Sequence, residues 1–566
     1  MKQKSISLKQ ALLLVLFACA SVACNDDNGG QEPDISFNSE SGEYAVKIGN
    51  TVELRAEVKN AVRPFYAWKQ DGKVVASDLV YEYKGEVLGA HFVNFRVDAD
   101  NGTQEKQVIV NVVDKMTPKI KMPANAVAYA GTDTPLACET DYTDATTRFE
   151  WTFQGKVVCT DSIYVFNAPD INIYTVAVKV TSADGVDVKN ISVSVIPKEQ
   201  PFIFFDCGRY VLPSQISAVR TQTCPIGRTL VLAPALFGFT KDATFEWEVD
   251  GTKQGGTSVC FAYKPASQGI HAVKVTAKEG SNSFTATVNV DCVAPEGTYF
   301  RAATLKSDYI ARKCFEYAPG PGQHVYGSYQ TAQQAIDYAQ SGLKTTLGTS
   351  YWLSLGPCPG YVIVGFDHSV KNHRADEADL DIVGNAFANW CECGVVWVSQ
   401  DDNGDGLPND TWYEIKGSEY GKPSTTQRYA MKYFRPSQEK TDILSISNEG
   451  ELIFWMRNAY NPNSGYFPWF MTEEYYILTG TCLASGFTNN GLEMNAGYDW
   501  GYVDNLNSIP GFRIANAVQQ DGTPADLDYI DFVKVQTAQV GQGTKVGDVD
   551  TETGAPVDLW LKAGKK

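Results

Sequence analysis

Three tryptophans, each followed four residues later by a glycine, constrain the fold more than any other feature of the chain. They lie in the segments FYAWKQDGKVV, FEWTFQGKVV and FEWEVDGTK. The tryptophans are Trp68, Trp151 and Trp247, and the glycines are Gly72, Gly155 and Gly251. After each segment come two long runs that alternate apolar and polar residues, such as HAVKVTAKEGSNSFTATVNVDCV. This alternation, with Gly-containing turns, indicates β-hairpins. The chain therefore contains three copies of a small β-unit.

The three copies predict three immunoglobulin-like sandwiches, each with its tryptophan in the core. We place them at residues 35–115, 116–198 and 199–297 and call them modules 1, 2 and 3. The aromatic–x–Trp pattern and the glycine turn resemble the PKD family, so we expect PKD-like modules that act as a stalk. Cys138 and Cys159 fall in the second copy and would allow one disulfide bridge.

The remaining residues, 298–566, have a different pattern and form the C-terminal domain. Short apolar runs such as YVIVGF, GVVWVSQ and YYILTG alternate with Gly, Asn, Asp and Pro. This pattern favours a large β-sandwich of jelly-roll type. The segment TAQQAIDYAQSGL predicts one short helix. The expected fold class is therefore all-β, with three tandem sandwiches followed by a larger one.

The first 24 residues look like an export signal of the lipoprotein type. Lysines precede the apolar run ALLLVLFACA, which is too short to span a bilayer, and the sequence SVAC follows. We expect lipid at Cys24, with Cys19 as the rival site and an ordinary signal peptide as the alternative. Residues 25–34 then serve as a flexible tether. Their acidic stretch resembles that of surface-exposed lipoproteins of the Bacteroidetes, which implies an outer-membrane, outward-facing location.

Charge excludes one class of partner. The formal net charge is -18, and a nucleic-acid-binding protein needs a basic surface. The lipid is the expected contact with the membrane, because no later apolar run is long enough to cross it.

The stretch DDNGDGLPNDTWYE resembles the first half of a calcium loop. Carboxylate or amide side chains stand at alternate positions and Gly406 follows, as in an EF-hand, but position 12 is Trp412. The candidate ligands are Asp401, Asn403, Asp405, Asn409, Asp410 and Glu414. Oxygen ligands suit Ca²⁺, and we expect its role to be structural; the alternative is a metal-free Asx-rich turn.

Aromatic residues are concentrated in the C-terminal domain, which holds eight of the 11 tryptophans. FWMRNAYNPNSGYFPWF and NAGYDWGYVDN place rings beside Gly, Pro and Asn, where loops on a rigid scaffold display binding residues. Displayed rings stack on sugars or on flat macrocycles. The candidate ligand-binding residues are Trp455, Tyr460, Tyr466, Trp469, Tyr498, Trp500 and Tyr502. The alternative is that these rings pack onto the edge of the sandwich.

Several C-terminal segments together resemble one family, the PKD-containing cell-surface lipoproteins of the Bacteroidetes. They are GYVIVGFDHSVKN, DIVGNAF, GVVWVSQDDNGDGLPNDTWYEIKGSEYG, GYVDN and IDFVKVQT, whereas CECG departs from the family's Ser-Glu-Pro-Gly type of segment. The resemblance implies an association with TonB-dependent receptors, including those for vitamin B12.

We therefore expect capture of a corrinoid or glycan for such a transporter. The alternatives are an adhesin that binds a host or neighbouring cell surface and a glycan-degrading enzyme. The motifs H-E-x-x-H and G-x-S-x-G do not occur, so we predict no catalytic residues.

Overall fold

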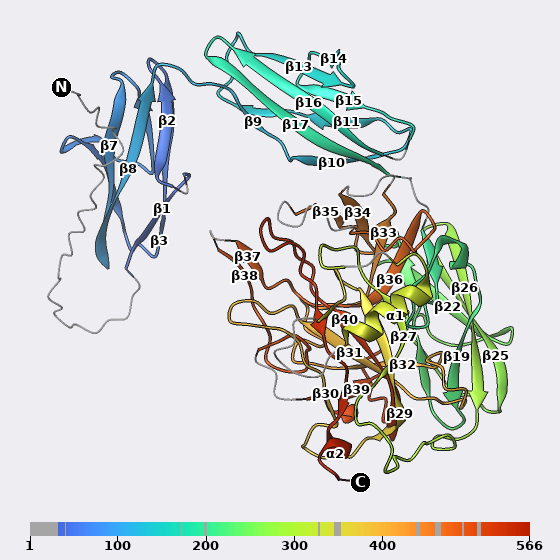
Figure 1. Ribbon diagram of the computed structural model, residues 1–566. Helices are drawn as coiled ribbons and strands as arrows, with labels where there is room; N and C mark the ends of the chain where they lie inside the picture. Colours follow the sequence, from blue (N-terminus) through green and yellow to red (C-terminus); the bar gives the residue numbers. More distant parts are fainter. Residues whose placement is uncertain are drawn as a thin grey trace, which may run out of the picture. The chain divides into compact units, whose positions relative to one another are not determined.

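The computed structural model describes residues 32–565 except 40, 171, 197–200, 326–328, 344–351, 437–441, 459–465, 490–491 and 507–510. Cys24 and Tyr460 thus lie outside the described residues. The chain forms two compact units, an N-terminal unit of residues 1–198 and a C-terminal unit of residues 199–566. Strands dominate both units, which confirms the all-β prediction (Figure 1). None of the described helices is long and apolar enough to cross a membrane.

Module 1 is a sandwich of a five-stranded sheet, in the order β2-β8-β7-β4-β5, and a three-stranded sheet, β1-β3-β6. Its strands are β1 Asp34–Phe37, β2 Glu43–Lys47, β3 Thr51–Lys59, β4 Phe65–Gln70, β5 Lys73–Ala76, β6 Val80–Lys84, β7 Gly89–Ala99 and β8 Gly102–Val113. The alternating residues that face inward on both sheets share one core around Trp68, as period-two patterning requires.

Modules 2 and 3 repeat this five-stranded sheet, in the orders β10-β17-β16-β13-β14 and β19-β26-β25-β22-β23. The strands of module 2 are β9 Lys119–Lys121, β10 Asn125–Tyr129, β11 Thr134–Ala137, β12 Glu139–Asp141, β13 Arg148–Phe153, β14 Lys156–Cys159, β15 Ile163–Phe166, β16 Asn172–Ser182 and β17 Gly185–Ile196. Those of module 3 are β18 Phe202–Phe204, β19 Arg220–Pro225, β20 Leu230–Leu232, β21 Ala235–Phe237, β22 Thr244–Val249, β23 Thr252–Lys253, β24 Phe261–Tyr263, β25 Gly269–Glu279 and β26 Asn282–Val293, with a 3₁₀ turn at Pro213–Gln215.

The tryptophan–glycine repeat has a direct structural cause. In each module the tryptophan lies in the core, at 0 or 1% exposure, on the strand that begins a hairpin. The two residues at the hairpin tip both have positive φ, for example 49° at Asp250 and 78° at Gly251. Positive φ at both positions is the backbone of a type I′ turn, which favours glycine at the second position.

The C-terminal domain is a sandwich of a six-stranded sheet, β27-β29-β40-β31-β32-β39, and a four-stranded sheet, β35-β34-β33-β36. The bounds are β27 Lys313–Ala318, β29 Tyr361–Lys371, β31 Gly394–Ser399, β32 Trp412–Ile415, β33 Thr426–Phe434, β34 Ile443–Ser447, β35 Leu452–Trp455, β36 Tyr475–Cys482, β39 Ala517–Val518 and β40 Tyr529–Thr537. Residues of both sheets share one core, as expected of a sandwich. Shorter pairs are β28 Leu353–Ser354 with β41 Glu552–Thr553, β30 Leu380–Asp381 with β42 Val557–Asp558, and β37 Phe487–Asn489 with β38 Glu493–Asn495.

The described helical segments of this domain are short. The predicted helix is α1, Ala332–Gly342, which Thr331 caps by accepting a hydrogen bond from the Gln334 backbone N–H. Ala335 and Ala339 form its buried face. A single further turn, α2, covers Leu559–Lys562, and a 3₁₀ turn covers Ile514–Asn516.

Gln536, on the central strand β40, links the two sheets of the sandwich. Its side-chain oxygen accepts from Trp397 Nε1 at 3.0 Å and from the Thr481 N–H at 3.2 Å, and its nitrogen donates to Thr481 O at 2.9 Å. A Cβ at the neighbouring Gly480 would stand 2.0 Å from the Gln536 oxygen, so this position requires glycine.

Module 3 is fused to the C-terminal domain rather than being a separate spacer. Val211 forms a β-bridge with Ile477, and the two segments share a small core that also contains Phe237 and Ala430. Arg209 donates to Glu316 through Nε at 2.7 Å. The expectation of three equivalent stalk modules is corrected accordingly, because module 3 buries apolar surface against its neighbour within one unit.

Candidate functional site

The predicted calcium loop connects two neighbouring strands of the six-stranded sheet. Strand β31 ends at Ser399, which pairs with Trp412 at the start of β32, so residues 400–411 form the connection. Asp401 and Asp410, near its two ends, are 2% and 0% exposed. Asn403, Asp405 and Asn409 lie nearer the surface. The loop is therefore an Asx-rich hairpin connection with two deeply buried carboxylates.

The tip of the loop is closed by its own hydrogen bonds. Asp405 N–H donates to Asn403 Oδ1 at 2.9 Å, and the Asn409 amide donates to Asp405 Oδ2 at 2.8 Å. At the base, the Gly406 N–H donates to Asp401 Oδ2 at 3.0 Å. The Asp405–Asn403 bond is the side-chain-to-backbone bond of an Asx turn, and the three bonds together order the loop.

Several buried carboxylate oxygens in the loop have no hydrogen-bond donor among the residues that the structure describes. They are Asp401 Oδ1, both oxygens of Asp402, and Asp410 Oδ2. Burial raises the pKa of Asp402 to about 7, and burial together with Asp402 raises the pKa of Asp410 to about 9. Charged oxygens left without partners in the interior are strongly destabilising. A cation would relieve this penalty.

Glu414 is not part of the loop site, which corrects its assignment as a metal ligand. Its carboxylate accepts from Thr481 Oγ1 at 2.6 Å, on the four-stranded sheet. It also lies near the ammonium of Lys534. Strand β32 turns this side chain between the two sheets, away from the loop.

The loop also fastens module 3 to the C-terminal domain. Arg228 of module 3 is 3.6 Å from Asp402 and 2.5 Å from Glu296, and its Nη2 donates to Gln400 Oε1 at 2.6 Å. Thr223 Oγ1 donates to Asp410, and Thr411 Oγ1 donates to Thr223 O at 2.8 Å. The loop is thus an internal joint, since its polar contacts cross between two sandwiches.

The predicted aromatic display is wrong for the rings that the structure buries. Trp455, Tyr466 and Tyr502 are 1%, 3% and 2% exposed. Trp455 Nε1 donates to Ser445 Oγ at 2.9 Å inside the four-stranded sheet. Tyr502 OH accepts from the Glu419 N–H at 2.8 Å. These rings fill the sandwich because each finds a partner for its polar atom there.

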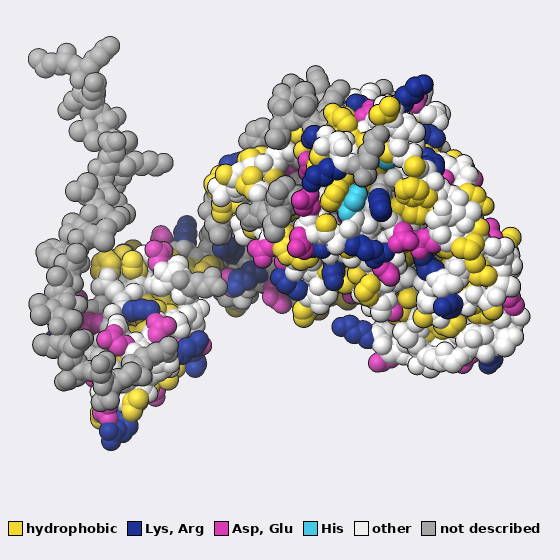
Figure 2. Space-filling view, turned by 90° about the horizontal axis from the view of Figure 1, so that it is seen from below, with side chains coloured by type: hydrophobic (Ala, Val, Ile, Leu, Met, Phe, Trp, Pro, Cys, Tyr) yellow, Lys and Arg dark blue, Asp and Glu magenta, His cyan; other side chains and the backbone are white. Residues whose placement is uncertain are grey.

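The other described candidates are half-buried. The guanidinium carbon of Arg435 lies over the ring of Trp469, 4.8 Å from the centre of that ring. Tyr498 donates its hydroxyl hydrogen to Ala484 O, and Trp500 is partly covered. All eight tryptophans of this domain are buried or partly buried. The face shown in Figure 2 mixes apolar with charged side chains. The candidate rings therefore do not form one open stacking platform.

A small cavity of about 60 Å³ lies between module 3 and the C-terminal domain, lined in part by Trp397, Trp412 and Lys534. The Lys534 ammonium is 4.8 Å from the centre of the Tyr361 ring and 5.1 Å from that of Trp397. It donates to Gly208 O at 3.0 Å, and burial lowers its pKa to about 8. The sequence does not single out this lysine, because nothing in IDFVKVQT shows that the whole strand is buried.

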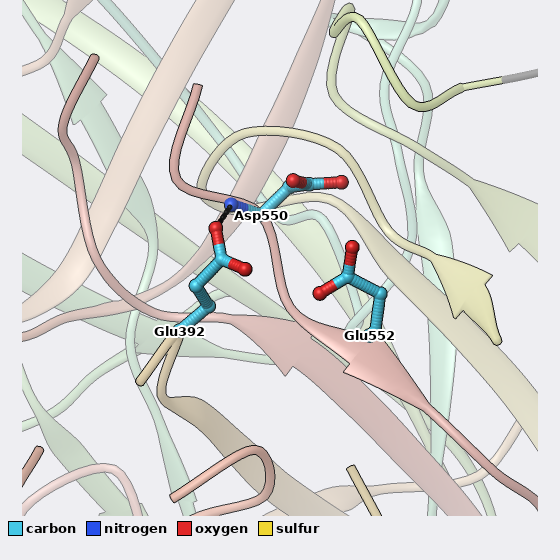
Figure 3. Close-up of side chains that lie close together, drawn as sticks. All are labelled: Glu392, Asp550 and Glu552. Carbon is cyan, nitrogen blue, oxygen red and sulfur yellow. Dashed lines mark hydrogen bonds between the residues drawn. The ribbon is translucent and has the colours of Figure 1, made fainter. Parts of the chain in front are cut away.

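A second group of acids was also missed. Within the described residues, Glu392, Asp550 and Glu552 offer oxygen atoms that all lie within 4.8 Å of one another (Figure 3). The signal that could have found them is the alternation of acids in GDVDTETG. Acids at alternate positions of an extended segment point to the same face.

All described cysteines are free thiols, so the Cys138–Cys159 bridge is not formed. Most of them are buried in apolar surroundings, where cysteine acts as a small hydrophobic residue.

Comparison with solved structures finds tandem immunoglobulin-like and fibronectin-like proteins at low similarity. Extracellular domains 3–5 of Drosophila OTK are 12% identical over 44% of this chain and 94% of theirs, with a TM-score of 0.19. The I67–I69 fragment of titin is 12% identical over 47% and 99%, with a TM-score of 0.17. Fibronectin(III)-like modules of Clostridium thermocellum CbhA are 19% identical over 30% and 97%, with a TM-score of 0.16. Scores this low carry no information about function.

Comparison by sequence gives one assignment. No curated protein matches the chain. The family model of the PKD-like domain matches residues 32–99, which covers most of module 1. This chain therefore contains a PKD-like domain.

Proposed function

We propose that this chain is a lipid-anchored protein of the cell surface that binds a macromolecular partner in an adhesion-type role. The PKD-like domain at residues 32–99 and the lipoprotein-type signal before it support an exported, modular protein. In this proposal the N-terminal unit is the spacer and the C-terminal unit is the binding part.

The burial of the aromatic rings carries the choice of a macromolecular partner. Trp455, Tyr466 and Tyr502 belong to the core, so they are not available to stack on a sugar or a corrin. The cavity beside Lys534, of about 60 Å³, is far below the roughly 300–1,000 Å³ of ordinary ligand pockets. The larger hollows of this unit, of about 360, 460 and 500 Å³, are open grooves, so a partner would bind on the outer surface, as in protein–protein recognition.

Beads coated with the full chain test this role. We expect them to be retained on mucin-coated surfaces or on fixed bacterial cells, whereas beads with heat-unfolded chain are not. Equal retention of the two bead types would contradict adhesion.

Capture of a corrinoid or glycan for a TonB-dependent transporter is the second candidate. It is favoured by an open groove of about 460 Å³ lined by Arg209, Tyr210, Arg220 and Asn409, which offers polar groups beside one aromatic ring. Titration of the full chain with cyanocobalamin and with a glycan panel, followed by tryptophan fluorescence, tests it. A saturable change with either probe, without bead retention, would replace the first proposal by the second.

Lipid attachment at Cys24 is proposed from the sequence, since this residue lies outside the described part. We expect Cys24→Ala to move the protein from the detergent phase to the aqueous phase after phase separation, while Cys19→Ala does not. The reverse result would assign the lipid to Cys19.

We also propose that calcium braces the 401–410 loop. The unpaired oxygens of Asp401 and Asp410 support this, because carboxylate oxygens are the ligands that Ca²⁺ prefers. The ion would hold the joint between module 3 and the C-terminal domain and would take no part in chemistry.

A further inference from the structure

The carboxylates of Glu392, Asp550 and Glu552 meet on one side of the C-terminal sandwich. Glu392 lies just before β31, Asp550 lies just before β41, and Glu552 is the first residue of β41. These segments pack closely, since a Cβ at Gly394 would stand 2.7 Å from the Thr551 methyl group. Figure 3 shows the three side chains converging, with the Asp550 N–H donating to Glu392 Oε1 at 3.0 Å.

Asp504 extends the group to four acids. It accepts from the Glu552 N–H at 3.0 Å. The amide nitrogen of Asn385, in the orientation that satisfies both contacts, lies 3.2 Å from oxygens of Asp504 and Glu552. Asp504 and Asp550 are 3% and 1% exposed, whereas Glu552 is partly open to solvent.

The described residues supply no positive charge to this group. No Lys, Arg or His within the described part of the chain forms an ion pair with Glu392, Asp504, Asp550 or Glu552. The neutral donors do not suffice either. Ser354 Oγ donates to Asp550 Oδ2, but the buried Asp550 Oδ1 has no hydrogen-bond partner in the described part of the chain. An unpartnered, buried carboxylate oxygen that faces other carboxylates needs an explanation, and a bound cation supplies one.

Burial raises the pKa of all four acids, and repulsion by neighbouring carboxylates adds to this for Glu392, Asp550 and Glu552. The pKa values of Asp504 and Asp550 rise to about 7, and those of Glu392 and Glu552 rise well above the usual range. Without an ion the group would therefore hold shared protons near neutral pH. These protons are the alternative occupant that an experiment must distinguish.

We propose that Glu392, Asp550 and Glu552, supported by Asp504, bind one calcium ion. Ca²⁺ is held by oxygens at about 2.3–2.6 Å, so two ligands on opposite sides can be about 5 Å apart, which accommodates the 4.8 Å limit of this group. Mg²⁺ needs shorter distances and a near-octahedral shell. Zinc prefers nitrogen and sulfur ligands, whereas this group offers carboxylate oxygens.

Calcium binding by the full chain tests the site, which does not depend on the proposed partner-binding role. The loop at 401–410 is first neutralised by Asp401→Asn with Asp410→Asn, so that one site remains. In this background we expect one bound calcium per chain at about 1 mM free ion, a concentration that fills extracellular calcium modules. Adding Glu392→Gln and Asp550→Asn should abolish binding. Adding Asp499→Asn, which removes an exposed charge of the same domain, should not.

The chosen substitutions keep the local hydrogen bonds. The amide introduced by Glu392→Gln retains an oxygen for the backbone N–H of residue 550, and the amide introduced by Asp550→Asn retains one for Ser354 Oγ. We therefore expect the chain with both substitutions to fold. If the loop background itself fails to fold, the same pair of substitutions in the otherwise unchanged chain should lower the calcium stoichiometry by one.

Thermal melting supplies a second readout. Calcium should raise the melting temperature of the loop-neutralised chain by at least about 4 °C, and this rise should vanish with Glu392→Gln and Asp550→Asn. Unchanged stoichiometry in the Glu392→Gln, Asp550→Asn chain would overturn the proposal in favour of shared protons. An equal shift with Mg²⁺ would overturn the assignment to calcium.

Discussion

Polar side chains in the interior of this chain depend on partners that are distant in the sequence. Gln536 bonds to Trp397 and Thr481, and Arg228 pairs with Glu296 and Asp402. Lys432, 0% exposed, lies over the rings of Phe202 and Phe237 of module 3, 4.8 and 5.2 Å from their centres. Such groups are stable only when these partners are present, because desolvation is otherwise uncompensated.

At this scale a histidine of module 3 gives a pH prediction. His271 Nδ1 is 2.9 Å from Asp250, and the hydrogen bonds to Asp250 and to Ser267 O raise the pKa of His271. A raised folded pKa adds stability below the unfolded pKa of about 6.5, and this stability is lost as the pH rises through the folded value. In urea unfolding between pH 5 and pH 8, roughly spanning this titration, the wild-type chain should lose more stability than His271→Gln. Buried acids such as Asp402, with a pKa of about 7, titrate in the same range in both proteins. Asp250→Asn should reproduce the histidine variant, and a wild-type slope in Asp250→Asn would refute the pairing.

Local side-chain roles could be predicted only where a repeat revealed them. The three repeat tryptophans were predicted to be core residues, and they are. Trp455, Tyr466 and Tyr502 were predicted to face solvent because Gly, Pro and Asn surround them, yet neighbouring strands and loops cover them. The sequence around a ring shows which turns are near it, but not which distant segment lies over it.

Turns and loops decide how the elements of this chain connect. The same type I′ hairpin closes all three modules, and period-two alternation predicts the long strands on its C-terminal side. The β31–β32 connection is longer and Asx-rich, and its acids reach into a neighbouring sandwich. Its spacing predicted a cation loop, whereas the partners of Glu414 depend on sheet packing that the spacing does not contain.

The type I′ turn predicts different outcomes for two glycines of module 3. Gly251 has a φ of 78°, whereas Gly255 does not have a positive φ of this kind, and added methyl groups meet nothing within 4 Å at either position. Gly251→Ala should therefore destabilise the C-terminal unit by about 1 kcal/mol through backbone strain alone. Gly255→Ala is the matched control and should leave the denaturation midpoint unchanged. Equal midpoints for the two variants would show that the turn tolerates alanine.

Chelation tests the calcium brace in the 401–410 loop. We expect EDTA to lower the melting temperature of the full chain, because the unpaired oxygens of Asp401 and Asp410 would then lose their counter-charge. Asp401→Asn with Asp410→Asn should reduce this shift in melting temperature by at least about 2 °C, whereas Asp499→Asn should leave the shift unchanged. An identical EDTA-induced shift in all three proteins would show that the loop does not bind the ion.

The whole molecule consists of two units, and the boundary falls after module 2. The sequence repeat predicts three sandwiches of one kind, and the structure contains them. It does not predict that the third shares apolar and charged contacts with the domain that follows. Those contacts join residues more than 170 positions apart, such as Arg228 and Asp402, and neither composition nor periodicity records such pairs.

Removal of Arg228 should loosen module 3 from the C-terminal domain. Arg228→Met leaves the buried Asp402 and the partly buried Glu296 without their cation, which should cost about 3–5 kcal/mol. We expect a second transition in urea unfolding, or earlier protease cleavage between residues 293 and 313, where the chain passes between the two sandwiches. Arg312→Met is the control, since its side chain forms a surface pair with Asp308. A single, unshifted transition in Arg228→Met would show that the apolar contacts alone hold the two together.

The shared core of Val211, Phe237, Ala430 and Ile477 also bears on how the protein can be divided for experiments. A recombinant fragment that starts at residue 298 would expose Ala430 and Ile477 to water and would remove Phe202 and Phe237 from the surroundings of Lys432. We expect such a fragment to aggregate and to express poorly. A fragment that starts at residue 199 keeps module 3, which covers these residues. A fragment that contains the C-terminal domain should therefore begin at module 3, one module earlier than the sequence repeats suggest.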